Sequence, residues 1–106
     1  MPNGFTRFRS KQFDVEAIEW DGTSLTWERI IAKLPEEYST ECHVIKKHRG
    51  SKYTRLKLIE KHHTGGETSE FVEEGEWVAF RRMPEYIQVF VTSKDSLGRF
   101  YWEVKD

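Results

Sequence analysis

The chain has 106 residues, which is enough for one domain and too few for two, so we expect residues 1–106 to form a single domain. Hydrophobic residues make up 37% and aromatic residues 14%, and 17 basic against 18 acidic side chains leave a net charge of −1. This composition excludes a disordered chain, a polyanionic mimic of DNA, a membrane span of about 20 apolar residues and, with Cys42 as the sole cysteine, a disulfide framework.

The first predicted strand covers residues 12–20, because polar and apolar residues alternate along it with a period of two. Asp21 and Gly22 predict a turn, and a short helix is predicted over about 24–34. Four large apolar residues of this segment are spaced i, i+3, i+4 and i+7, so they lie on one face of the helix: Trp27, Ile30, Ile31 and Leu34. Pro35 ends the helix, because its ring clashes with the preceding turn and it lacks a backbone donor.

A hairpin is predicted in the middle of the chain. One strand opens near Val44 and Ile45, a turn follows at 49–52, and a second strand covers 53–59. Cations and leucines alternate along the second strand, in the order Arg55, Leu56, Lys57 and Leu58. Successive side chains on a strand point to opposite faces, so the leucines share one face and the cations the other.

Residues 62–66 predict a loop, and the rest of the chain reads as short strands separated by turns. The strands are expected at 71–72, 77–80, 86–91 and 100–104, with turns at 73–76, 83–84 and 96–98. About six short strands and one helix indicate a small α+β domain. We expect a mainly antiparallel twisted sheet or a small open barrel, with the helix covering one side.

Two segments carry a resemblance to known proteins. Residues 7–22 read RFRSKQFDVEAIEWDG, and residues 72–78 read VEEGEWV. They resemble parts of a family of small phage and prophage proteins. That family has an aromatic-Arg-Lys-Lys-Pro start, a strand similar to Val-x-Ile-Glu-Ala-x-Gln-Trp, and later a Val-x-Pro-Gly-Asp-Trp-Ile turn. Residues 100–104 also look like the closing aromatic strand of that family.

The two segments at 7–22 and 72–78 cover under a quarter of the chain, and they depart from the family at several positions. Phe13 replaces a proline or valine, Glu19 a glutamine and Glu74 a proline, and residues 43–63 are longer and more basic than the family's central hairpin. The resemblance implies phage origin and an approximate fold, and it transfers no catalytic residue. Because the chain has one cysteine and no secretory signal at the N-terminus, we expect a cytoplasmic protein. For a phage-encoded protein, this means the cytoplasm of the host cell.

The charge is distributed unevenly along the chain. Residues 1–42 carry a net charge of −3, residues 43–63 carry +6 and residues 64–106 carry −4. The candidate partner-binding residues lie in the basic block: Lys46, Lys47, Arg49, Lys52, Tyr53, Arg55 and Lys57. Such a hairpin fits an acidic protein surface, or it fits nucleic acid, with Tyr53 stacked on a base. Alternatively, the lysines only keep the hairpin soluble and protect it from edge-to-edge pairing.

Other candidate sites have weaker support. Cys42 and the histidines at 43, 48, 62 and 63 supply metal ligands, but their spacing fits no zinc signature and adjacent ligands on a strand point to opposite faces. Glu73, Glu74 and Glu76 surround Gly75 and fit an acidic turn better than a pair of catalytic carboxylates. We therefore expect no metal, no cofactor and no catalytic residue.

These observations favour a non-enzymatic phage-encoded accessory protein that binds a host or phage protein, as a modulator of the host or of its defences. The alternative is a nucleic-acid-binding protein that uses the basic hairpin 43–63. We expect no membrane association and either a monomer or a small homo-oligomer, since exposed strand edges permit dimerisation.

Overall fold

The computed structural model describes residues 4–9, 14–46 and 50–103, without the side chain of Trp102. Within these ranges the chain forms two helices and eight strands. They are β1 (Thr6–Arg9), β2 (Asp14–Glu19), α1 (Ser24–Lys33), β3 (Tyr38–Lys46), β4 (Lys52–Lys61), β5 (Glu67–Val72), β6 (Trp77–Arg82), β7 (Ile87–Thr92), α2 (Lys94–Phe100) and β8 (Trp102–Glu103). Neither helix of the described ranges has the length and apolar character needed to cross a bilayer.

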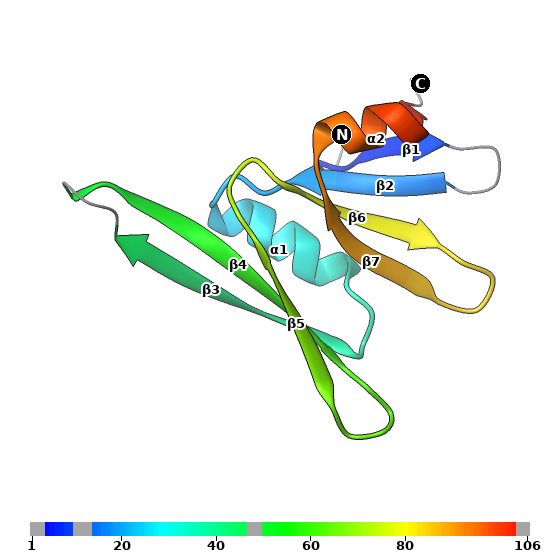
Figure 1. The fold of residues 1–106 in the computed structure, drawn as a ribbon, viewed down its shortest axis with the longest axis horizontal. Coiled ribbons are helices and arrows are strands. Elements are labelled where there is room, and N and C mark those ends of the chain that lie inside the picture. The colour runs from blue at the N-terminus through cyan, green and yellow to red at the C-terminus, as the bar shows by residue number, and fades with distance from the viewer. Residues whose placement is uncertain (1–3, 10–13, 47–49, 104–106) are drawn as a thin grey trace.

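The strands form two antiparallel sheets, which confirms the predicted α+β class (Figure 1). Sheet A has the order β7-β6-β2-β1-β8, and sheet B has the order β3-β4-β5. The sequence predicted a single sheet of about six strands. The difference arises because the long β3–β4 hairpin pairs only with β5, so it forms a separate sheet that packs against sheet A.

Sheet A is the central layer, with a hydrophobic cluster on each of its two faces. On one face, α2 covers the cluster formed by Phe8, Val15, Ala17, Trp77, Ala79 and Leu97. On the other face, α1 and sheet B close the larger cluster formed by Ile18, Trp20, Ile30, Leu56, Leu58, Val72, Val78 and Phe80. The predicted leucine face of β4 is therefore confirmed as a core face.

Helix α1 confirms the predicted helix within one residue. The Thr23 side chain caps its first turn by accepting a hydrogen bond from the Thr26 backbone N–H at 3.2 Å. Of the residues predicted to share one face, Ile30 is fully buried but Ile31 is 46% exposed. One residue advances about 100° around a helix, and the core contacts only the side on which Ile30 lies.

Two elements were not predicted. The segment around Ser96 and Gly98 was expected to be a turn, but it lies in α2, because the Ser93 side chain caps the helix and buried Leu97 anchors it. The strand β1 was missed because only Phe8 of its four residues is buried, between two exposed arginines.

Residues 14–22 and 72–78 lie side by side in the structure. Strands β2 and β6 pair with Ile18 opposite Val78, and the Trp20 backbone exchanges hydrogen bonds with the turn around Gly75. Gly22 has a φ of +80°, and a Cβ there would lie 2.9 Å from the Glu74 carboxylate. These segments therefore form one structural unit at the centre of sheet A.

Candidate functional site

The basic block of the sequence forms a long hairpin that extends beyond the rest of the molecule. Strand β5 pairs with β4 only as far as Leu56, so residues 43–46 and 52–55 continue as a two-stranded arm. Figure 1 shows this arm reaching past α1 and away from sheet A. An element of this shape can insert into a partner without any change in the core.

The arm is held at its base by two side chains that replace the missing third strand. The backbone N–H of Thr54 donates to the Glu74 carboxylate at 2.6 Å, and its carbonyl accepts from the Trp20 indole N–H at 2.8 Å. Both groups of Thr54 would pair with β5 if that strand were longer. The turn at residues 73–76 and the buried Trp20 thus fix the direction of the arm relative to sheet A.

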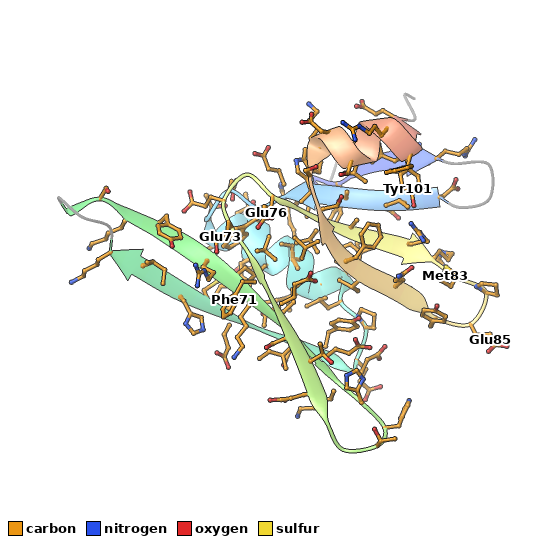
Figure 2. All side chains as sticks on the ribbon, viewed as in Figure 1. Phe71, Glu73, Glu76, Met83, Glu85 and Tyr101 are labelled. Atoms are coloured by element: carbon orange, nitrogen blue, oxygen red, sulfur yellow. The ribbon has the colours of Figure 1, made fainter. Side chains whose placement is uncertain are left out.

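Removal of the Glu74 carboxylate tests this support. We expect Glu74→Ala to lower the free energy of unfolding by about 1 kcal/mol, because a charge-assisted hydrogen bond to Thr54 is lost. Urea denaturation measures this change. The matched control is Glu85→Ala, which removes the same charge in the β6–β7 loop, far from the arm (Figure 2). Equal stability losses in the two variants would show that Glu74 does not support the arm.

The structure separates the predicted partner-binding residues onto two faces. Tyr53, Arg55 and Lys57 lie on the outer face of sheet B, since β4 residues alternate and Leu56 and Leu58 face the core. Lys46 and Lys52 lie on the opposite face, directly across from each other at the end of the hairpin. Lys47 and Arg49 lie outside the described residues. The cations among the described residues therefore do not form one continuous surface.

On the outer face, the cations of β4 surround Phe71, which is 44% exposed (Figure 2). The Arg55 guanidinium lies 4.8 Å and the Lys57 ammonium 5.9 Å from the centre of the Phe71 ring. The His43 ring meets Phe71 edge-on at 6.3 Å. Phe71 was not among the predicted partner-binding residues. The alternation of β5 could have indicated it, because Phe71 falls on the face opposite to buried Val72.

Acidic residues compensate the cations of the outer face. Arg55 forms an ion pair with Glu73 at 2.6 Å, and its guanidinium also donates to the Tyr53 hydroxyl at 3.5 Å. The three cations of this face, Arg55, Lys57 and Lys61, are matched by Glu41 and Glu67 on the same face and by Glu73, which reaches Arg55 from the flanking turn. The excess positive charge of the described hairpin therefore lies at its end, with Lys46 and Lys52.

The carboxylates of the acidic turn all have structural contacts. Glu73 pairs with Arg55, Glu74 accepts from Thr54, and Glu76 accepts from the Glu73 backbone N–H at 2.7 Å. These bonds fix the turn and the base of the arm. Each of the three carboxylates therefore has a structural contact.

The candidate metal ligands do not converge in the described part of the chain. Cys42 packs against the core while His43 points to the outer face, and the His62 ring contacts the Thr68 hydroxyl. No group of three or more His, Cys, Asp or Glu side chains suited to a metal occurs among the described residues, which exclude His48. Burial raises the pKa of the Cys42 thiol, which keeps it protonated at neutral pH.

Sequence analysis also missed a hollow of about 450 Å³ beneath α2. Its walls include Phe90, Tyr101 and half-buried Arg81, whose guanidinium lies 5.1 Å from the centre of the Phe90 ring and donates to the Tyr101 hydroxyl. The hollow forms only where β6, β7 and α2 meet, so no local sequence pattern marks it. Arg81 ties the end of α2 to sheet A.

Tyr38, at the start of β3, gives the hairpin a measurable pH dependence. Burial and the Glu60 carboxylate opposite raise the pKa of Tyr38 to about 12. The unfolded chain has the ordinary tyrosine pKa of about 10, so this stabilisation is complete below pH 10 and is lost as the pH rises towards 12. We expect the melting temperature to fall more steeply across this range in the wild type than in Tyr38→Phe. Parallel curves would contradict this role of Tyr38.

Comparison with known proteins gives no match: no protein-family model fits the chain, and neither the curated proteins nor the solved structures contain a similar one.

Proposed function

We propose that this chain is a non-enzymatic, phage-encoded accessory protein that binds an acidic surface on a host or phage protein. The end of the β3–β4 hairpin makes the contact, in the host cytoplasm and without a cofactor. The resemblance of residues 7–22 and 72–78 to phage proteins supports the origin. A role in modulating the host or its defences follows from that origin.

The observation that carries the proposal is the pairing of Lys46 directly opposite Lys52. Like charges at opposite positions of an antiparallel pair destabilise a hairpin by a few tenths of a kcal/mol up to about 1 kcal/mol. Both residues are exposed, so the folded chain gains no packing energy from them. A carboxylate of a partner placed between the two ammonium groups would relieve this repulsion and form two charge-assisted hydrogen bonds.

A protein partner fits the charge distribution better than nucleic acid does. Two neighbouring cations match a local acidic patch, whereas a nucleic acid presents a continuous row of phosphates. The outer face of sheet B has balanced charge, and the segments on either side of the hairpin carry −3 and −4. Those acidic segments would repel a long polyanion.

Affinity capture from nuclease-treated lysate of infected host cells tests the proposal. We expect the wild type to retain a protein that the double variant Lys46→Glu/Lys52→Glu does not retain. The matched control is Lys94→Glu/Arg99→Glu, which makes the same change of net charge on α2, and it should retain the partner. Equal retention by the wild type and the hairpin variant would show that Lys46 and Lys52 do not contact the partner. Salt-sensitive binding of labelled DNA or RNA, lost in the hairpin variant, would establish the nucleic-acid alternative instead.

A further inference from the structure

Strand β3 presents a long and regular open edge. It lies at the edge of sheet B, and β4 is the only strand of the described residues that pairs with it. Its nine residues pair with β4 in continuous register, from Tyr38 opposite Glu60 to Lys46 opposite Lys52. It contains no proline, and no bulge interrupts it. Edges of this kind readily pair with another strand.

The positions of the free backbone groups on this edge follow from the hydrogen bonds of β4. Thr54 uses its N–H and carbonyl on the side away from β3, with Glu74 and Trp20. Its partner Val44 is therefore in a non-hydrogen-bonded pair and directs its own N–H and carbonyl to the open edge. Alternation along the strand gives the same direction to Thr40 and Cys42. The backbone of Tyr38 follows the same alternation, because its N–H points away from β4 and donates to the Pro35 carbonyl outside sheet B.

We propose that two copies of this chain pair through β3, antiparallel and related by a two-fold axis at Cys42. Cys42 is the midpoint of Tyr38–Lys46, so this register gives the longest overlap of the two strands. It places Cys42 opposite Cys42, and Thr40 opposite Val44 of the second copy. The outward N–H and carbonyl groups of all three residues then bond across the axis, giving about six hydrogen bonds and one continuous six-stranded sheet.

Side-chain complementarity favours this register over its neighbours. Glu41 of each copy lies opposite His43 of the other, in pairs whose Cα atoms approach to about 4.5 Å. Within one chain these two side chains already lie 3.1 Å apart on the exposed outer face, so the dimer forms an alternating group of four at the axis. A register centred on residue 41 would oppose two glutamates, and one centred on residue 43 would oppose two histidines. The β3 edges of two copies are thus complementary to each other.

The dimer also covers two apolar side chains that the single chain leaves exposed. Val44 is 63% exposed, on the arm beyond the cover of α1. In the proposed register it lies beside Thr40 of the second copy, where Trp27 of α1 donates to the Thr40 hydroxyl at 2.8 Å. Ile31 follows Trp27 by one helical turn on that side of α1, and it is 46% exposed. Burial of Val44 against Ile31 of the second copy adds a hydrophobic contribution to the backbone pairing.

Sedimentation equilibrium tests the dimer without any partner protein, and its result is independent of the proposed docking function. We expect the wild type to sediment with twice the 12.7 kDa of one chain. Val44→Pro should give a folded monomer, because proline removes an N–H of the open edge and no N–H of the β3–β4 ladder. Val44→Thr keeps the N–H and the branched shape, and should still form the dimer.

A charge exchange tests the register and does not depend on proline being tolerated. Glu41→Lys alone should weaken the dimer about tenfold, because it removes, on both sides of the axis, the carboxylate that faces His43 of the other copy. The double variant Glu41→Lys/His43→Glu restores opposite charges across the axis and should recover the dimer. A wild type that stays monomeric at its solubility limit, or a double variant as weak as Glu41→Lys, would overturn the proposal.

Discussion

Replacement of Trp20 with alanine is expected to lower the free energy of unfolding by about 3–5 kcal/mol, a large fraction of the stability of a domain of this size. Trp20 is 0% exposed and belongs to the cluster between sheet A and sheet B. Its indole donates to Thr54 of sheet B, while its backbone bonds to Glu76 and Gly75. Loss of the side chain leaves a cavity and removes the contact that joins the two sheets.

Urea denaturation followed by far-ultraviolet circular dichroism measures this loss, and conservative variants rank the contributions. Trp20→Phe keeps most of the volume and loses the hydrogen bond to Thr54, so we expect a loss of about 1–3 kcal/mol. Trp27→Phe is the matched control, because half-buried Trp27 also donates a hydrogen bond, to Thr40, yet lies at the edge of the cluster. A loss for Trp27→Phe as large as for Trp20→Phe would contradict the central role of Trp20.

Replacement of Lys46 with glutamate is expected to change stability and binding in opposite directions. The change turns a like-charge pair with Lys52 into an opposite-charge pair, so the free energy of unfolding should rise by about 0.2–1 kcal/mol. The same change removes one of the two cations that contact an acidic partner. The affinity should therefore fall about tenfold, mainly through the association rate, which depends on salt.

Lys52→Glu is the reciprocal variant and should behave in the same way, because the two lysines occupy equivalent positions. Denaturation and titration with the captured partner measure the two effects on one protein sample. A mutation that only damaged the fold would lower stability and affinity together. Higher stability with unchanged affinity would mean that the lysines act only as solubilising charges.

Local patterns in the sequence predicted the elements whose signals are themselves local. The helix was found because Trp27, Ile30 and Leu34 follow a helical period and Pro35 ends it. The hairpin was found from the alternation of leucines and cations around Leu56. The helix α2 was missed because its stability depends on burial of Leu97 against sheet A, which no local pattern reveals.

The candidate site was predicted only in part, for a related reason. The sequence identified the basic hairpin, and Lys46 and Lys52 lie at its exposed end. It could not show that Arg55 is compensated by Glu73, since that contact depends on the pairing of β4 with β5. Nor could it separate the cations by face before the register of the hairpin was known.

Hydrogen exchange of the chain, alone and bound to its captured partner, locates the docking surface. Docking through the hairpin should slow exchange in the arm, at residues 44–46 and 52–55, with no change in α2 or β7. Slower exchange confined to α2 and β7, around the hollow beside Arg81, with the arm unaffected, would contradict docking through the hairpin.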